Sequence, residues 1–425
     1  MDCADATLVR GAARAALVGI AAGEKSEAEA AGLVDELGEL AQNLGIEIAR
    51  KSVVKLRQID ARHFVGSGKL SLIIREAKEA GADIIIVDDE LSPAQQRSWE
   101  AAAQMPVVNR QEIILDIFAA RANTREARLQ VELAKLEYSL PRLRRAWSHL
   151  DRQRGGGVTQ RGGGESQLEL DRRSVREQIA KLKRELAQVR VSREVQRKRR
   201  MRAGLPAAAV VGYTNAGKSS LINLLTSSDL LAQDKLFATL DPSTRRMRLP
   251  GGKTLLLTDT VGFVRNLPHR FVEAFKATLE EALVSDFLVH VVDSSSPAAE
   301  EHMRTTMRVM GELGADGKRV LTVFNKADVP SSSQNFHYLR SLCPAGVWIS
   351  AKTGENVDAL RAALEKMVAS GSRFMRLKIP HSESAAIARA HEVGTIAEKK
   401  ALSDCVEMSV SIPLGAAPYF EKWLV

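Results

Sequence analysis

Gly212-Tyr213-Thr214-Asn215-Ala216-Gly217-Lys218-Ser219 is the stretch that decides the fold of this chain. It matches the pattern G-x-x-x-x-G-K-[ST] without a gap. The apolar run Ala207 to Val211 precedes it, and the run Ser220 to Leu225 follows it. A strand, a glycine-rich loop and a helix in this order make a P-loop, which binds nucleotide phosphates. A glycine-rich turn before an ordinary core helix is the weaker alternative.

Each residue type in this loop has a physical role. Gly212 and Gly217 let the backbone bend, so that successive N–H groups and the helix N-terminus converge on phosphate oxygens. Lys218 supplies a positive charge to the β- and γ-phosphates, and Ser219 offers a hydroxyl to Mg²⁺. The similar stretch 66–69 (Gly-Ser-Gly-Lys) lacks the first glycine and the final Ser or Thr of the pattern, so we interpret it as a turn.

Further motifs follow in the order that a GTP-binding domain requires. The stretch Asp259-Thr260-Val261-Gly262 is the second switch. In it, Asp259 can reach Mg²⁺ through water, and the Gly262 N–H can bind the γ-phosphate. In Asn325-Lys326-Ala327-Asp328, the Asp328 carboxylate would accept from two guanine donors that adenine does not present. Ser350-Ala351-Lys352 can brace the base from its other side. We predict a GTP-binding domain at 203–370.

The first switch should lie between the loop and the second switch, in Leu236-Phe237-Ala238-Thr239-Leu240-Asp241-Pro242-Ser243-Thr244-Arg245. A threonine there completes the Mg²⁺ shell and senses the γ-phosphate. We expect Thr239 in this role, with Thr244 as the alternative, although both fit plain turn residues. Phe263 stands where many GTPases carry a glutamine that positions water, and its ring cannot do so. We therefore expect slow intrinsic hydrolysis, with Lys218, Thr239 and Gly262 as the catalytic groups and a partner that reorganises the site.

Length and composition limit the class of protein. With 425 residues, 45% of them hydrophobic, the chain is long enough for about two to four domains. It contains no uninterrupted apolar run of about 18 residues and has an acidic start, so we expect a cytoplasmic protein with no stable membrane insertion. Three cysteines far apart indicate free thiols and neither a disulfide framework nor a zinc site. A monomer is expected.

The positive charge is concentrated in one segment. Residues 121–200 hold 22 Lys/Arg and 10 Asp/Glu, whereas the rest of the chain holds 39 and 42. Apolar residues at heptad spacing, most of them leucines, run from Leu129 to Leu150 and again from Leu168 to Val189, which predicts a basic helical hairpin at 121–202. Pro141 should kink the first helix, and Ser166 has the spacing of a capping box for the second.

The predicted hairpin carries a glycine-rich tip, 154–164, with six glycines. Such a loop can adapt to folded RNA, so we expect RNA contacts from arginines in and near it. They are Arg152, Arg154, Arg161, Arg172 and Arg173. A solvated helical face with an ordinary connection is the alternative.

The two ends of the chain indicate further domains. Residues 1–120 alternate apolar runs with helical patterns, which predicts a parallel α/β domain. Within it, Asp88, Asp89 and Glu90 follow a predicted strand, at an end where ligands often bind in open α/β sheets. We interpret them instead as a solvated acidic turn. Residues 371–425 predict a small α+β domain with strands near 373–379 and 406–412 and an apolar end that belongs to its core. The fold class is therefore α/β, with a helical hairpin and a mostly parallel sheet in the GTP-binding domain.

The P-loop, the first and second switches, the glycine-rich tip and Phe64-Val65-Gly66-Ser67-Gly68-Lys69 together resemble the HflX family, within the Obg-HflX group of GTPases. The resemblance covers the chain from about residue 45 onward. It implies a Mg²⁺-dependent, ribosome-associated GTPase that binds the large ribosomal subunit and its rRNA and helps to split stalled ribosomes. In the tip, Gly163 stands where relatives often have proline.

Three functions remain open at this point. The first is a GTPase that splits or rescues ribosomes, and the second is a ribosome-assembly GTPase without splitting activity. The third is a GTPase coupled to RNA modification, for which residues 1–120 offer no nucleophile or cofactor motif.

Overall fold

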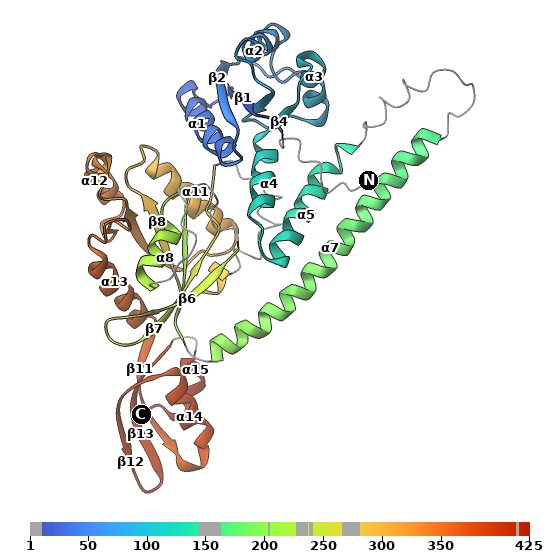
Figure 1. Ribbon diagram of the computed structural model, residues 1–425. Coiled ribbons are helices and arrows are strands. Elements are labelled where there is room, and N and C mark those ends of the chain that lie inside the picture. Colours follow the sequence, from blue (N-terminus) through green and yellow to red (C-terminus); the bar gives the residue numbers. More distant parts are fainter. Residues whose placement is uncertain are drawn as a thin grey trace. The chain divides into compact units, whose positions relative to one another are not determined.

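A computed structural model describes residues 11–143, 163–202, 205–226, 237, 241–265, 281–413 and 416–425 (Figure 1). The chain divides into two compact units by its contacts. Unit 1 comprises residues 1–187, 235–237 and 265–275, and unit 2 comprises 188–234, 238–264 and 276–425. The division into four domains, 1–120, 121–202, 203–370 and 371–425, stays a prediction.

Unit 1 begins with a four-stranded sheet in the order β2-β1-β3-β4. All its strand pairs are parallel, which confirms the predicted parallel α/β architecture. The strands are β1 (Arg14–Ala21), β2 (Glu47–Lys55), β3 (Ile84–Val87) and β4 (Val107–Asn109). The helices between them are α1 (Glu27–Asn43), α2 (Ser67–Glu79) and α3 (Pro93–Ala103). Strands β1, β3 and β4 are buried almost throughout, as expected where helices cover both faces of a parallel sheet, whereas the edge strand β2 is charged and partly exposed.

Helices pack on both faces of this sheet. One core cluster joins side chains of α2 and α3 to Val18 and Ile85. On α1, a Cβ added to Gly19 of β1 would lie 2.4 Å from Val34 Cγ2, so this strand needs a glycine there. The stretch 66–69 is not the isolated turn that we expected, because Gly66 is the N-cap of α2 and the next residues form its first turn.

Three further helices complete the described part of unit 1 or extend from it: α4 (Arg110–Arg121), α5 (Arg125–Ser139) and α7 (Gly163–Arg202). The predicted heptad positions of α5 pack with those of α7, since Leu129, Leu133 and Leu136 share one cluster with Val175, Leu182 and Leu186. Helix α5 ends at Ser139 and is not kinked at Pro141 as expected. Pro141 has no backbone N–H to continue the helical hydrogen bonds, which explains an end at this point. Helix α7 starts at Gly163, slightly before the predicted start.

Unit 2 contains a six-stranded sheet in the order β10-β9-β8-β5-β7-β6. Its strands are parallel except for the antiparallel pair β6 and β7. They are β5 (Ala207–Gly212), β6 (Ser243–Arg248), β7 (Thr254–Asp259), β8 (Phe287–Asp293), β9 (Arg319–Asn325) and β10 (Val347–Trp348). The accompanying helices are α8 (Lys218–Thr226), α11 (Ala299–Glu312), α12 (Pro330–Leu342) and α13 (Val357–Ser370). This is the mostly parallel sheet predicted for the GTP-binding domain.

A three-stranded antiparallel sheet, β11-β13-β12, ends the chain. Its strands are β11 (Ser372–Pro380), β12 (Thr395–Ala401) and β13 (Cys405–Pro413), with helices α14 (Ser384–Val393) and α15 (Ala417–Phe420) and the short 3₁₀ turns η3 (His381–Glu383) and η4 (Glu421–Trp423). Strands β11 and β13 were expected, whereas β12 and α14 were not. Phe420 and Trp423 lie in the core of this part, as predicted for the apolar end. Within the described residues, no helix combines the length and the hydropathy needed to span a membrane.

Candidate nucleotide-binding site

The P-loop lies at the carboxyl end of β5, where the chain turns into α8 (Figure 1). Its two pattern glycines are required by geometry. Gly212 has φ +155°, and a Cβ there would lie 2.2 Å from the carbonyl oxygen of Val291. Gly217 has φ +89°, and its Cβ would lie 2.2 Å from Nδ2 of Asn325. Asn215 also has a positive φ, 58°. The loop therefore has the tight backbone curvature that a phosphate-binding loop needs.

Lys218 is the buried cation of this loop. Its Nζ donates hydrogen bonds to the carbonyl oxygens of Gly212, at 3.1 Å, and Tyr213, at 2.7 Å. Burial lowers the pKa of Lys218 to about 8, and the nearby Asp259 carboxylate opposes that shift. Because both acceptors are carbonyl groups of the loop itself, the ammonium group is held at the centre of the loop, where anionic phosphates would gain most from it.

Ser219, at the start of α8, and Asp259, at the end of β7, form an oxygen-rich pair. Ser219 Oγ donates to Asp259 Oδ2 at 2.7 Å. A hydroxyl and a carboxylate are hard oxygen donors of the kind that Mg²⁺ prefers, so these residues fit that ion. Thr239, the other expected Mg²⁺ ligand, lies outside the described residues with Ala238 and Leu240. The alternative, Thr244, lies in β6, where its Oγ1 is 3.0 Å from that of Thr258.

The second switch is hydrogen-bonded to the P-loop through its backbone. The Phe263 N–H donates to the Gly212 carbonyl at 3.1 Å, and the Thr214 N–H donates to the Phe263 carbonyl at 2.8 Å. Gly262 lies against the loop, because a Cβ added to it would be 2.9 Å from Lys218 Nζ. The Phe263 ring is buried, with 1% of the residue exposed. This ring belongs to the core, and it offers no group to a water molecule at the phosphates.

Thr260 and Val261 of the second switch are held in place as well, one by a hydrogen bond and the other by burial. Thr260 Oγ1 donates to the Val210 carbonyl at 2.7 Å, and Val261 is 5% exposed. The predicted phosphate-binding loop and the second switch are therefore adjacent in space.

The predicted base-binding motifs meet beside the P-loop. Asn325 Nδ2 donates to the Ala216 carbonyl at 2.8 Å, and its Oδ1 accepts from the Ala351 N–H at 2.9 Å. Ser350 Oγ donates to Asp328 Oδ1 at 2.6 Å, which orients the carboxylate expected to read guanine. Asn325 thus ties the P-loop to both base motifs.

The remaining base-motif residues follow the same arrangement. The Ala327 N–H donates to the Ile349 carbonyl at 3.0 Å. Lys352, the last residue of the second base motif, is exposed. Lys326 has φ 65° and forms an ion pair of 2.7 Å with Asp293 at the end of β8. Asp293 was not among the predicted residues. Its position directly after the apolar run 287–292 was the available signal, because polar residues at the carboxyl ends of parallel strands often form binding sites.

Two histidines near the loop were also missed. The His302 ring of α11 stacks on the Tyr213 ring with centroids 3.7 Å apart and 7° between their planes. His290 of β8 is buried, and burial together with the Lys218 charge lowers its pKa to about 4. A neutral His290 leaves Lys218 as the positive charge at this point. Neither residue belongs to a short motif, so the sequence gives no sign of it.

The remaining predicted residues lie on other segments of the chain. Phe237 is buried in unit 1, and Asp241 lies just before β6. Arg152, Arg154 and Arg161 lie outside the described residues. Arg172 and Arg173 are on α7, where Arg173 Nε pairs with Glu177 Oε1 at 3.0 Å and both side chains are largely exposed.

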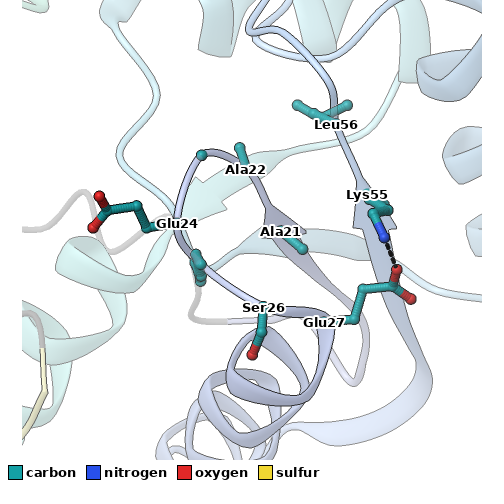
Figure 2. A pocket seen from close by; sticks show the side chains of 9 residues that line it. Ala21, Ala22, Glu24, Ser26, Glu27, Lys55 and Leu56 are labelled. Atoms are coloured by element: carbon teal, nitrogen blue, oxygen red, sulfur yellow. Dashed lines mark ion pairs between the residues drawn. The ribbon is translucent and has the colours of Figure 1, made fainter.

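The sheet of unit 1 has a small pocket of its own, between the ends of β1 and β2 and the start of α1 (Figure 2). Its side chains include Ser26 and the ion pair of Lys55 with Glu27, 2.9 Å apart. No residue predicted for nucleotide or RNA binding lines it. Ser26 Oγ accepts from the Glu29 N–H as the N-cap of α1, which is a sufficient structural reason for its position.

Comparison with known proteins agrees with the motifs. Residues 32–119 match a family model described as GTP-binding GTPase N-terminal, and residues 121–200 match one described as GTP-binding GTPase Middle Region. Residues 207–326 match a model described as 50S ribosome-binding GTPase.

Curated relatives align over nearly the whole chain. The GTPase HflX of Akkermansia muciniphila is 44% identical over 422 residues, which is 97% of each chain. The GTPase HflX of Escherichia coli K12 is 37% identical over 383 residues, or 90% of each chain. A solved GTP-binding protein of Sulfolobus solfataricus in complex with GDP aligns with 83% of this chain and 98% of its own at 24% identity, with a TM-score of 0.42. On the P-loop, the mostly parallel sheet and these alignments, the chain belongs to the HflX family of P-loop GTP hydrolases.

Proposed function

We propose that this chain is a ribosome-associated GTPase that binds GTP with Mg²⁺ between the P-loop, the switches and the base motifs, while its basic helical segment contacts rRNA of the large ribosomal subunit. The observation that carries this proposal is the meeting of four separate sequence motifs at one edge of one sheet, linked by Asn325 and by the Phe263 backbone. A family model described as 50S ribosome-binding GTPase supports the choice of partner.

Each group has a defined role in the proposed reaction. Water attacks the γ-phosphorus, the bond to the β–γ bridging oxygen breaks, and GDP and phosphate leave. Lys218 and the Gly262 N–H stabilise the charge that develops on the phosphate oxygens. Ser219 and Thr239 hold Mg²⁺, which would neutralise charge on the β- and γ-phosphates. Asp328 selects guanine.

The buried Phe263 supports a dependence on a partner. Its ring is in the core and its backbone is bonded to the P-loop, so Phe263 cannot orient the attacking water. Hydrolysis by the isolated chain should therefore be slow and should accelerate on the large subunit.

The basic segment supports rRNA as the surface that the chain contacts. Arg172 and Arg173 lie on α7, one face of which packs on α5 through Val175, so other faces carry charge away from the seam. Each phosphate that such a helix neutralises releases a counterion, which makes binding steeply dependent on salt.

Sedimentation with purified large subunits tests the proposal. The intact chain should sediment with them in the presence of a non-hydrolysable GTP analogue more than with GDP, and subunits should accelerate GTP hydrolysis. The double variant Arg172→Gln/Arg173→Gln should bind more weakly and show a shallower salt dependence. Lys399→Gln/Lys400→Gln removes the same charge from the exposed strand β12 and should behave like the intact chain. Equal hydrolysis rates with and without subunits would contradict the proposal.

Within this proposal, splitting or rescue of stalled ribosomes is the favoured role, and ribosome assembly is the second candidate. Gradient profiles of a deletion strain separate the two. Loss of an assembly factor accumulates immature subunits, whereas loss of splitting leaves mature particles. A role coupled to RNA modification would appear as changed nucleotide masses in rRNA from the same strain.

A further inference from the structure

A buried network of ion pairs lies in unit 1 at the ends of β3 and β4. Asp88 is not part of a solvated turn, as the sequence suggested, because its side chain is fully buried. Arg110, at the start of α4, places its Nη2 2.6 Å from Asp88 Oδ1 and its Nη1 2.9 Å from Glu36 Oε1 on α1. The Arg110 side chain is 2% exposed. Burial reduces the screening of these charges, so the stability of each charged group depends on its oppositely charged partners.

Glu36 binds a second arginine with its other oxygen. Arg265 Nε donates to Glu36 Oε2 at 3.0 Å, and the Arg265 side chain is 11% exposed. One carboxylate therefore bridges two guanidinium groups, one from α4 and one from the chain just after the second switch. A buried carboxylate with two charge-assisted partners is held more rigidly than one in an exposed pair.

The contact of Arg265 with Glu36 lies close in sequence to the second switch. Arg265 comes three residues after Gly262, and the chain passes from unit 2 to unit 1 between Val264 and Arg265. At the other end, the chain passes from unit 1 to unit 2 between Phe237 and Ala238. The segment 238–264, which contains the second switch, therefore belongs to unit 2 but continues at both ends into residues of unit 1.

The first of these ends is anchored as well. Phe237 is 2% exposed, and its ring meets the Phe118 ring of α4 edge-on, with centroids 4.6 Å apart. The anchor at Arg265 restricts the conformations open to the residues directly before it, among them Gly262. Such a restriction lowers the entropy that must be lost when backbone groups are aligned on the phosphates.

We propose that Glu36 is a positioning residue for GTP hydrolysis, which acts by holding Arg265 and so restricting the adjacent segment that carries Gly262. The proposal rests on the role of the Gly262 N–H at the γ-phosphate put forward above. Glu36 itself touches neither nucleotide nor water. Its loss should affect the rate of the chemical step and leave the binding of GTP unchanged, because the P-loop and the base motifs hold most of the nucleotide.

Steady-state GTP hydrolysis by the full chain tests this role. Glu36→Gln keeps the size of the side chain and removes its charge, and we expect kcat to fall about tenfold with KM for GTP unchanged. The matched control is Asp35→Asn, in the same helix, which removes a carboxylate from the exposed pair with Lys51 at 2.6 Å. It should leave both constants unchanged. A Glu36→Gln chain that folds and keeps the kcat of the unaltered chain would overturn the proposal.

A double-mutant cycle separates positioning from general destabilisation. Arg265→Gln should lower kcat to a similar extent, and Glu36→Gln/Arg265→Gln should be no slower than Glu36→Gln, because the interaction between Glu36 and Arg265 is lost in all three variants. Effects on kcat that add would overturn the proposal. Arg265→Lys leaves the bond between Glu36 and Arg110 intact, and it should restore part of the rate. It serves as the decisive variant where melting shows that Glu36→Gln does not fold.

Lys218→Ala distinguishes a failure of the nucleotide site from a failure of the positioning role. If this variant hydrolyses GTP as fast as the unaltered chain, the proposed site is wrong, and the premise of the positioning role falls with it. If Lys218→Ala is inactive and Glu36→Gln is fully active, the site stands and the positioning role alone is wrong.

Discussion

Ser219 Oγ donates a hydrogen bond of 2.7 Å to Asp259 Oδ2 and thereby joins the start of α8 to the end of β7. The pair places a hydroxyl and a carboxylate where the P-loop and the second switch meet. Both groups are ligands that suit Mg²⁺, one directly and one through water.

Removal of the Ser219 hydroxyl should weaken the use of Mg²⁺. In Ser219→Ala we expect the Mg²⁺ concentration for half-maximal hydrolysis to rise about tenfold, since a hydrogen bond or ligand to a charged group contributes roughly 1.5–3 kcal/mol. Ser220→Ala, the next residue of the same helix, is the control. Titration of GTP hydrolysis with Mg²⁺ makes the comparison, and equal requirements in the two variants would contradict the assignment.

Asp328 should determine the choice of base. Asp328→Asn loses a charged acceptor for two guanine donors, so GDP affinity should fall about 100-fold or more, at roughly 1.5–3 kcal/mol for each bond. The amide group of Asn could instead donate to the O2 of xanthine, so affinity for xanthosine diphosphate should rise. Competition of each nucleotide with a fluorescent GDP analogue measures both changes.

A smaller effect is expected when only the orientation of Asp328 is lost. Ser350→Ala removes the 2.6 Å hydrogen bond to Asp328 and should weaken GDP binding about fivefold. Asp358→Asn, an exposed carboxylate of α13, should have no effect on GDP binding. A GDP affinity in Asp328→Asn that equals that of the Asp358→Asn control would show that the base is read elsewhere.

The lowered pKa of Lys218, about 8, predicts a pH dependence of nucleotide binding. Below that pH the side chain is charged and ready to bind phosphate, whereas above it the free protein must first take up a proton. The dissociation constant for GTP should therefore rise between pH 8 and 9, towards tenfold per pH unit. Lys218→Ala should bind weakly with no such rise over this range. Calorimetric titrations in two buffers of different ionisation enthalpy would show the proton uptake, and its absence at pH 9 would refute the prediction.

Short motifs made the nucleotide site predictable, because the P-loop, the second switch and the base motifs each follow a strand at a fixed spacing. Parallel strands bring their carboxyl ends to one edge of a sheet, so the order of the motifs was sufficient to place Gly217, Asp259 and Asn325 near one another. Phe263 was likewise recognised from its position after Gly262.

Long-range burial was not predictable. Asp88 resembles a surface residue in the sequence, and its partner Arg110 is 22 residues away, while Glu36 is 74 residues from Arg110. These groups meet only because β1, β3 and β4 are neighbours. Strand β12 was missed for another reason: it is an edge strand whose Glu398, Lys399 and Lys400 are exposed, so it lacks the apolar pattern of a buried strand.

The buried carboxyl of Glu112 should make the stability of unit 1 depend on pH. Glu112 lies at the start of α4, where it accepts hydrogen bonds from Tyr138 and from Gln96 Nε2, the latter at 3.0 Å. Burial raises its pKa from 4.5 to about 7. A carboxyl whose pKa is higher in the folded chain stabilises the fold fully below its unfolded value, and this contribution is lost as the pH rises from 4.5 to about 7.

Glu112→Gln removes this titration and keeps a side chain that can still accept a hydrogen bond. Relative to the unaltered chain, the variant should gain about 2–3 kcal/mol in the free energy of unfolding between pH 4.5 and 7, since each pKa unit corresponds to ~1.4 kcal/mol. Urea unfolding followed at the two pH values measures that difference. Glu132→Gln, at an exposed position on α5, is the control, and its difference in stability from the unaltered chain should change little with pH. If the two variants show the same pH dependence, the Glu112 carboxyl is ionised in the folded chain, and its hydrogen bonds must then outweigh its burial.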